Sequence, residues 1–206
     1  MNFYQKHILP KLLNVTCSLS DIEQERQHWI PKARGHVLEI GIGSGLNIPF
    51  YDKSKVSKVW GLDPSQELLN IASTVAKESV IDIELLNRSA ANIPIPNHSM
   101  DYVVMTYTMC SISNITVVLR EIKRVLKNNG TLLFCEHGKA PDSFIYKWQT
   151  ILSPLWATLF GGCHLNKDIL AILNTADFKV TQLKKGYLPK TPRIAGYNYA
   201  GLARSF

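Results

Sequence analysis

A glycine-rich segment with an acidic residue before it and another after it is the part of the sequence best suited to chemistry. Gly41, Gly43 and Gly45 follow an apolar run, and Glu39 lies two residues ahead of the first glycine. Glycines let the backbone turn tightly and approach a ligand closely. We expect a helix to start directly after this loop, so that its free N–H groups add to a binding site.

The spacing of these residues separates two kinds of nucleotide site. The dinucleotide fingerprint G-x-G-x-x-G needs a glycine at its sixth position, where this chain has Leu46. A carboxylate beside the loop would also repel a pyrophosphate. Asp63 lies 22 residues past Gly41, where an acidic side chain can accept hydrogen bonds from both ribose hydroxyls. The pattern favours a nucleoside ligand without a pyrophosphate; the alternative is that the glycines only pack a helix on a strand and Asp63 only caps the next helix.

Short β-rich runs alternate with stretches of helical period from residue 36 onward, which predicts repeated βα units and a mostly parallel sheet. Ligands bind at the carboxyl ends of such strands. The pattern also predicts that the helix over 115–127 ends at the Asn-Asn-Gly run of 128–130. We predict strands over 36–40, 56–62, 81–86, 101–107, 131–136, 178–183 and 195–203, and helices over 65–78, 115–127 and 166–175.

Two segments stand outside this alternation. Residues 1–34 have the pattern of two helices and form a predicted N-terminal helical cap, with Tyr4 and Trp29 as candidates to close a pocket. Residues 143–165 form a predicted aromatic lid, in which Pro154 would break or kink a helix. Such a lid either roofs an apolar pocket or lies in a lipid interface. The length of 206 residues fits one domain over 1–206.

Charge and cysteine content limit the classes of partner. The net charge is +7, and six basic residues with no acidic one fall in residues 178–206, which leaves 17 minus 16, or +1, for residues 1–177. This edge permits contact with an anionic membrane. The four cysteines form no C-x-x-C pair, so no metal site is predicted. Without an apolar run of about 18 residues or a signal sequence, we expect a cytoplasmic protein with peripheral contact at the inner membrane.

Motifs along nearly the whole chain resemble those of the class I S-adenosylmethionine-dependent methyltransferases. The first is Leu-Glu-Ile-Gly-Ile-Gly-Ser-Gly-Leu-Asn at 38–47, followed by the motifs at 61–65, 100–104 and 124–130. Within that superfamily, the later motifs at 134–137, 148–149, 154–156, 162–166 and 197–199 resemble the methyltransferase-like 7 (thiol methyltransferase) group and its small bacterial relatives. The membrane-anchored animal members have an N-terminal hydrophobic span that this sequence lacks.

The resemblance implies an α/β, Rossmann-like seven-stranded sheet with the last strand antiparallel, helices on both faces and an N-terminal helical extension. It implies S-adenosyl-L-methionine as cofactor. The glycine loop would hold the methionine end, Asp63 the ribose hydroxyls and the loop at Ser89 the adenine, although many relatives have an acidic residue in place of Ser89. Thr106 and Tyr107 would border the methyl group. The implied cofactor-binding residues are Glu39, Gly41, Gly43, Gly45, Asn47, Asp63, Pro64, Ser89, Ala90 and Thr106.

Methyl transfer from a sulfonium is an in-line displacement that needs alignment and exclusion of water more than catalytic groups. Where a base is needed, His137 and His164 are the candidates, with Glu136 a weaker third and Tyr107 beside the reacting atoms. The alternatives are structural: His137 closes a strand, and His164 binds backbone at a helix entry. Direct transfer needs no covalent intermediate on a cysteine.

The aromatic lid predicts a small lipophilic acceptor, and the resemblance favours a thiol. One alternative is N- or O-methylation of a phospholipid head group or a quinone-type lipid; another is a non-catalytic S-adenosylmethionine-binding protein. The run Thr-Tyr-Thr-Met at 106–109 lacks the D/N-P-P-Y/F pattern of amino-methyltransferases that act on bases. Nucleic acid is therefore an unlikely partner.

Overall fold

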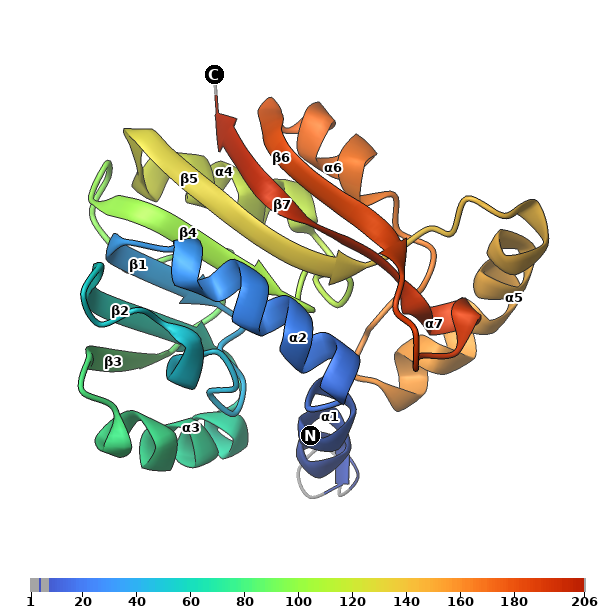
Figure 1. Ribbon diagram of the computed structural model, residues 1–206, viewed down its shortest axis with the longest axis horizontal. Coiled ribbons are helices and arrows are strands. Elements are labelled where there is room, and N and C mark those ends of the chain that lie inside the picture. Colours follow the sequence, from blue (N-terminus) through green and yellow to red (C-terminus); the bar gives the residue numbers. More distant parts are fainter. Residues whose placement is uncertain (1–3, 5–7, 206) are drawn as a thin grey trace.

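Seven strands form a single sheet in the order β3-β2-β1-β4-β5-β7-β6 (Figure 1). The computed structural model describes residue 4 and residues 8–205, so residues 1–3 and 5–7 of the predicted cap and Phe206 lie outside the described part. The strands are β1 (Gly35–Ile40), β2 (Val56–Asp63), β3 (Asp82–Asn87), β4 (Met100–Thr106), β5 (Leu126–His137), β6 (Phe178–Tyr187) and β7 (Tyr197–Ser205).

Strand direction follows the predicted pattern. The pairs β1–β2, β1–β4, β2–β3 and β4–β5 are parallel, while β7 runs antiparallel to both β5 and β6. The seven-stranded sheet with an antiparallel last strand is thereby confirmed. Parallel strands place their carboxyl ends at one edge, which brings the loops after β1, β2 and β4 together.

Helices cover both faces of the sheet. Val118, Ile122 and Leu173, from α4 and α6, pack with Phe134 on one face, and Trp29, the last residue of α2, packs with neighbouring strands on the other. Figure 1 shows α2 in front of the sheet and α4 and α6 behind it. The helices are α1 (Leu9–Cys17), α2 (Ser20–Trp29), α3 (Gln66–Glu78), α4 (Ile115–Val125), α5 (Ser143–Leu159), α6 (Ile169–Thr175) and α7 (Arg193–Gly196), with short 3-10 turns η2 (Ile30–Lys32) and η3 (Ile48–Phe50).

The predicted helix directly after the glycine loop is wrong. The chain makes only the 3-10 turn η3 there, and Tyr51 is already extended with φ −66° and ψ 133°. Only the five residues 51–55 separate this turn from β2, which leaves no length for an α-helix. The loop N–H groups at this site therefore come from the turn itself and not from a helix end.

The predicted end of the helix at 115–127 is also wrong. Helix α4 ends at Val125, and Asn128 to Gly130 belong to β5. Leu126 pairs with Met100, and Lys127 makes an ion pair with Asp101 at 2.7 Å. Pairing with a neighbouring strand outweighs the local preference of Asn and Gly for a helix end. Pairing with β7 likewise extends β6 to Tyr187, beyond the predicted end at residue 183. Helix α6 starts at Ile169, later than the predicted residue 166, because Asp168 caps it there.

Helix α5 runs through Pro154 without the predicted break. Polar side chains attach it to the body of the protein. Gln149 accepts a hydrogen bond from the Ala140 N–H (2.9 Å) and donates to the Gly138 carbonyl (3.0 Å), and Ser153 accepts one from the Leu165 N–H (3.3 Å). Among the described residues, none of the helices has the length and apolar character needed to cross a membrane.

Candidate functional site

A cavity of about 480 Å3 lies at the carboxyl ends of β1, β2 and β4. This volume is in the usual range for small-molecule sites. Its wall comes from the glycine loop, from Asp63 to Ser65 after β2, from Thr106 to Thr108 after β4, and from α1, α2 and the end of α5. A larger hollow of about 600 Å3 beside β3 contains none of the predicted site residues.

Most of the predicted cofactor residues share this cavity. Those that line it, together with Tyr107, are Gly41, Gly43, Asp63, Pro64, Ser89, Ala90 and Thr106. Glu39, Gly45 and Asn47 do not line it and lie one layer behind the wall. The lid reaches the cavity through Phe160 and Gly161, whereas Trp29 is buried in the core and does not close the pocket.

The glycine loop depends on glycine for two different reasons. Gly41 and Gly43 have φ of +71° and +56°, in the left-handed region that disfavours side chains. A Cβ on Gly41 would lie 2.3 Å from Oγ1 of Thr108, so the loops after β1 and β4 can touch only through a glycine. A Cβ on Gly43 would meet nothing nearer than the Gly41 carbonyl at 3.9 Å. Gly43 therefore leaves open space for a ligand.

Asp63 joins the ends of β1 and β2. Its Oδ2 accepts a hydrogen bond from the Gly43 N–H (3.0 Å), and its Oδ1 accepts one from the Ser65 N–H (2.8 Å). Burial raises the pKa of this carboxyl above its ordinary value, and the two N–H groups counteract that rise. Each carboxylate oxygen keeps a further lone pair, so Asp63 can shape the loop and accept ligand hydroxyls together.

Glu39 supports the wall of the cavity from behind. Its carboxylate accepts hydrogen bonds from Asn47 Nδ2 (2.9 Å) and from the Tyr51 hydroxyl (2.7 Å), and burial raises its pKa to about 7. Asn47 Nδ2 also donates to Thr106 Oγ1 (2.9 Å). Glu39 therefore fixes the orientation of Asn47, which in turn holds the residue that faces the cavity.

That residue is Arg26, which the sequence reasoning missed. Its Nη1 donates to Asn47 Oδ1 and to Thr106 Oγ1 (3.0 Å), and its guanidinium lies 5.6 Å from the centre of the Tyr107 ring. The side chain is buried, lines the cavity, and has no hydrogen-bond partner for Nε among the described residues. The sequence contains one indication of this position, because Arg26 falls at helical spacing on the same face as the apolar Ile22 and Trp29.

Tyr107 turns the chain sharply at the end of β4. Its φ is +53°, which is uncommon for a residue with a side chain and is often found at functional sites. The hydroxyl donates to Asn198 Oδ1 (3.2 Å) and accepts from the Cys135 thiol (3.4 Å). Burial raises the pKa of Tyr107 well above its ordinary value. The phenol therefore stays protonated and borders the cavity as a neutral group.

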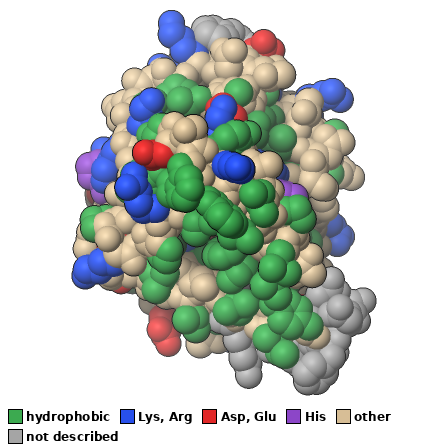
Figure 2. Space-filling model, turned by 90° about the vertical axis from the view of Figure 1, so that its right-hand side faces the viewer, with side chains coloured by type: hydrophobic (Ala, Val, Ile, Leu, Met, Phe, Trp, Pro, Cys, Tyr) green, Lys and Arg blue, Asp and Glu red, His purple; other side chains and the backbone are tan. Residues whose placement is uncertain are grey.

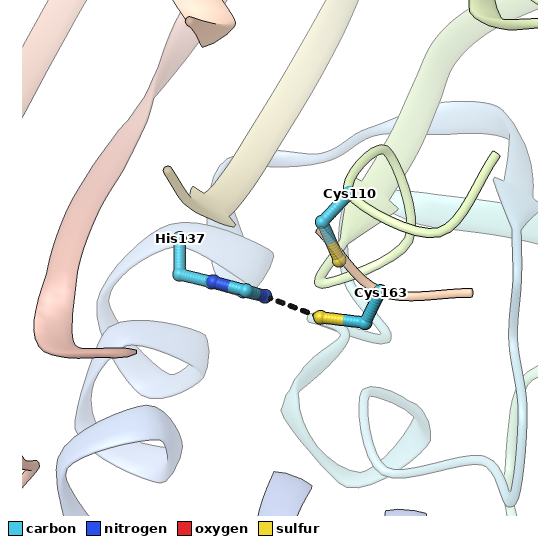
Figure 3. A group of neighbouring side chains, drawn as sticks. All are labelled: Cys110, His137 and Cys163. Carbon is cyan, nitrogen blue, oxygen red and sulfur yellow. Dashed lines mark hydrogen bonds between the residues drawn. The ribbon is translucent and has the colours of Figure 1, made fainter. Parts of the chain in front are cut away.

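The predicted bases lie outside the cavity wall. His137 Nε2 lies 3.0 Å from Sγ of Cys163 (Figure 3), and its ring stacks on Tyr107. His164 Nδ1 lies 3.3 Å from Ser153 Oγ. Glu136 accepts hydrogen bonds from the Thr108 and Met109 N–H groups, both at 2.9 Å. The catalytic roles of His137 and His164 stay predictions, and neither side chain reaches the cavity in this conformation.

Known proteins resemble this chain in both sequence and fold. A family model described as "Methyltransferase domain" matches residues 38–134. Human thiol S-methyltransferase TMT1A is 31% identical over 81% of this chain and 71% of its own length. Demethylmenaquinone methyltransferase of Bacillus licheniformis is 29% identical over 64% and 58% of the two chains. The crystal structure of an S-adenosylmethionine-dependent methyltransferase from Aquifex aeolicus matches with a TM-score of 0.67 and 21% identity, over 94% of this chain and 97% of that one.

Proposed function

The chain belongs to the class I S-adenosylmethionine-dependent methyltransferases, and we propose that its acceptor is a small lipophilic thiol. The transfer of a methyl group from S-adenosylmethionine follows from the family. The identity of the acceptor does not follow from the family, because the relatives include both thiol and quinone methyltransferases. The charge of the side chains in the cavity wall is the observation that favours a thiol acceptor.

The residues of the cavity fit the cofactor. The open space in front of Gly43 leaves room for the cofactor, and the Asp63 carboxylate can accept hydrogen bonds from its ribose hydroxyls. We assign the adenine to the loop at Ser89 and Ala90. When bound, the cofactor supplies an electrophilic methyl group on a sulfonium. The protein has to align an acceptor with that group and exclude water.

A thiol suits this wall better than an amine or an alcohol. The titratable side chains that line the cavity are Cys17, Arg26, Asp63 and Tyr107, so among the described lining residues there is a fixed cation but no histidine. A thiol with an ordinary pKa of about 8.5 is ionised near neutral pH when a cation lies beside it. An alcohol would need a base to lose its proton. Arg26 can stabilise a thiolate without any base.

Apolar side chains complete the acceptor end. Leu9, Ile112 and Phe160 also line the cavity. They exclude water from a thiolate and favour an acceptor with an apolar body. Tyr107, whose hydroxyl donates to Asn198, lines the same cavity. These residues position the acceptor, and none of them has to move a proton.

The test is a competition among acceptors with methyl-deuterated S-adenosylmethionine. The purified protein is incubated with alkyl thiols of increasing chain length, a demethylated quinone and phosphatidylethanolamine liposomes, and the products are identified by mass spectrometry. We expect S-methyl products, with kcat/KM rising with the apolar length of the thiol. Transfer to the quinone or the phospholipid with no S-methyl product would refute a thiol acceptor.

A lipid acceptor is the second candidate, and one surface favours it. Helix α5 exposes one apolar stripe at helical spacing, which we call the α5 stripe: Phe144, Trp148, Ile151, Leu155 and Leu159. Phe144 is 69% exposed and Leu155 is 61% exposed, whereas the polar Gln149 and Ser153 face inward. This arrangement is the reverse of a helix that packs on a core. Figure 2, which faces this side of the molecule, shows hydrophobic side chains gathered there with Lys and Arg around them.

We propose that the α5 stripe contacts an anionic membrane surface, whichever acceptor is used. Apolar side chains beside an exposed lysine of the same helix, Lys147, are the composition of an interfacial helix. The basic C-terminal segment is partly neutralised within the protein, since Lys184 pairs with Glu25 at 2.5 Å and Arg193 with Asp142 at 3.3 Å. Apolar contact therefore has to supply most of the affinity.

Vesicle co-sedimentation tests this contact. Leu155→Asp should reduce binding to phosphatidylglycerol vesicles at least about tenfold, because a carboxylate would enter the interface. Val80→Asp is the matched control, since Val80 is 77% exposed and lies between α3 and β3, outside the α5 stripe. Equal binding by both variants would refute the assignment.

A further inference from the structure

Three side chains that could bind a metal ion meet behind the wall of the cavity. Cys110 follows β4, His137 ends β5, and Cys163 lies in the loop between α5 and α6. The two sulfur atoms and one ring nitrogen all lie within 4.8 Å of one another. In Figure 3 the ring of His137 and both thiols point toward a common centre. Within the described part of the chain, no other set of three such residues comes this close.

The chain backbone holds these residues together independently of their side chains. The His164 N–H donates to the Cys110 carbonyl (3.1 Å), which joins the two cysteine loops. Glu136 accepts hydrogen bonds from the Met109 N–H (2.9 Å) and the Cys110 N–H (3.4 Å), which fixes the first loop beside the end of β5. The three donor atoms are therefore placed by the fold, from three segments far apart in the sequence.

We propose that Cys110, His137 and Cys163 form a binding site for a thiophilic divalent ion of the Zn2+ class. Two thiolates and one imidazole are a donor set typical of zinc, and three protein ligands leave one coordination position open. Binding releases two thiol protons, so the charge of the site stays at zero and no charge is left uncompensated. In this role His137 is a ligand and not a general base.

The distances require only a small adjustment. With Zn–S of about 2.3 Å and Zn–N of about 2.0 Å in a tetrahedron, the donor atoms lie about 3.5 to 3.8 Å apart. His137 Nε2 and Cys163 Sγ are now 3.0 Å apart and would separate by about half an ångström. The other pairs lie within 4.8 Å and close by about an ångström at most. Rotation of the thiol side chains supplies such movements.

Two titratable side chains hold the loop that carries Cys110. Glu136 accepts a hydrogen bond from the Cys110 N–H, and the Lys167 ammonium donates to the Met109 and Ile112 carbonyls (3.0 and 2.7 Å). Both cysteines are buried, and His137 Nδ1 is buried without a hydrogen-bond partner among the described residues. A metal ion would bind at Nε2, which now contacts the Cys163 thiol, and the ring proton would then stay on Nδ1.

Occupancy would stabilise the cavity. Tyr107 and Ser111 flank Cys110, Phe160 and Gly161 precede Cys163, and all four line the cavity. A metal ion would join the loop after β4 to the loop after α5 and so fix two opposite parts of this wall. The site is independent of the acceptor proposed above, because no methyl-transfer step passes through it.

The test uses the full-length, reduced chain after treatment with a chelator. Co2+ is added as a spectroscopic probe, and Zn2+ affinity is measured by competition with a chromogenic chelator. We expect one Co2+ per chain with a thiolate charge-transfer band and the intense visible bands of a tetrahedral site, displacement by Zn2+, and a Zn2+-dependent rise in Tm. Absence of binding to the wild-type protein would overturn the proposal without reference to any variant.

Matched variants locate the ion. Cys110→Ser, Cys163→Ser and His137→Gln should each weaken Zn2+ binding at least about a hundredfold, because each removes one of three ligands. Cys17→Ser and His164→Gln are the controls and should bind like the wild type. Equal binding by all five variants would place the ion elsewhere. A reduced chain that binds no metal but forms a Cys110–Cys163 disulfide under mild oxidation would identify a redox pair and refute the metal site.

Discussion

Replacing Asp63 with asparagine should weaken cofactor binding strongly. A hydrogen bond to a charged acceptor contributes about 1.5 to 3 kcal/mol, and Asp63 has room to accept two from ribose hydroxyls. Its present partners, the Gly43 and Ser65 N–H groups, both need an acceptor, so an amide NH2 would also face one of these donors. A loss of about 3 kcal/mol corresponds to about 150-fold in Kd. Calorimetric titration with S-adenosylhomocysteine measures it directly.

The loss of affinity has two sources, the missing hydrogen bonds to the ribose and the altered contacts of the loop, and a thermodynamic cycle separates them. An S-adenosylhomocysteine analogue without one ribose hydroxyl should bind the wild type about tenfold more weakly, and should bind Asp63→Asn with little further loss. Asp52→Asn, in the loop before β2, is the matched control and should not change the affinity. If Asp63→Asn binds the full ligand within about threefold of the wild type, the ribose assignment is wrong. A weakened Kd with an unaltered penalty for the missing hydroxyl would mean that Asp63 only shapes the loop.

Three further predictions concern the wall of the cavity. Gly41→Ala should lower the free energy of unfolding more than Gly43→Ala, since only a Cβ on Gly41 clashes with Thr108. Gly43→Ala should cost about 1 kcal/mol of backbone strain and block the ligand. Urea unfolding measures the change in stability, and cofactor titration measures the change in ligand binding. Because burial raises the folded-state pKa of Glu39 to about 7, its contribution to the free energy of unfolding is present below about pH 4.5 and is lost, by about 3 kcal/mol, as the pH rises to 7. Glu39→Gln should remove this pH-dependent loss. The prediction is contradicted if the difference in free energy of unfolding between the variant and the wild type is the same at pH 5 and pH 8. Arg26→Gln should shift the acidic limb of the kcat profile for a thiol to higher pH by about one unit, because kcat reports the pKa of the bound thiol, and an unshifted profile would remove Arg26 from stabilising the thiolate.

The sheet was predictable because its signal is local. Apolar runs such as those ending at Ile40 and Asp63 are buried on both faces, as parallel strands are, and the turn residues after them mark the edge where ligands bind. The positions of Gly41, Gly43 and Asp63 around one cavity follow directly from that topology. The resemblance to a family supplied the antiparallel last strand, which periodicity alone does not indicate.

The remaining parts of the site depend on contacts between distant segments. Arg26 comes from a helix before the first strand, and only the packed structure shows that Asn47 and Thr106 hold its guanidinium at the cavity. Cys110, His137 and Cys163 have no recognisable metal-ligand spacing, since two loops and the end of β5 bring them together. The end of α4 was mispredicted for the same reason, because pairing of Leu126 with Met100 overrides a local helix-end signal.

Helix α5 connects two environments, since its outer stripe is apolar and the residue after its last turn, Phe160, lines the cavity. If a bilayer covers that stripe, a lipophilic acceptor reaches the cavity by diffusion within a surface and not from bulk water. Its effective concentration is then the mole fraction in the lipid, so that adding inert lipid dilutes it. Because Gln149 and Ser153 hold the helix through hydrogen bonds, the stripe can pass from water into lipid without loosening the wall behind it.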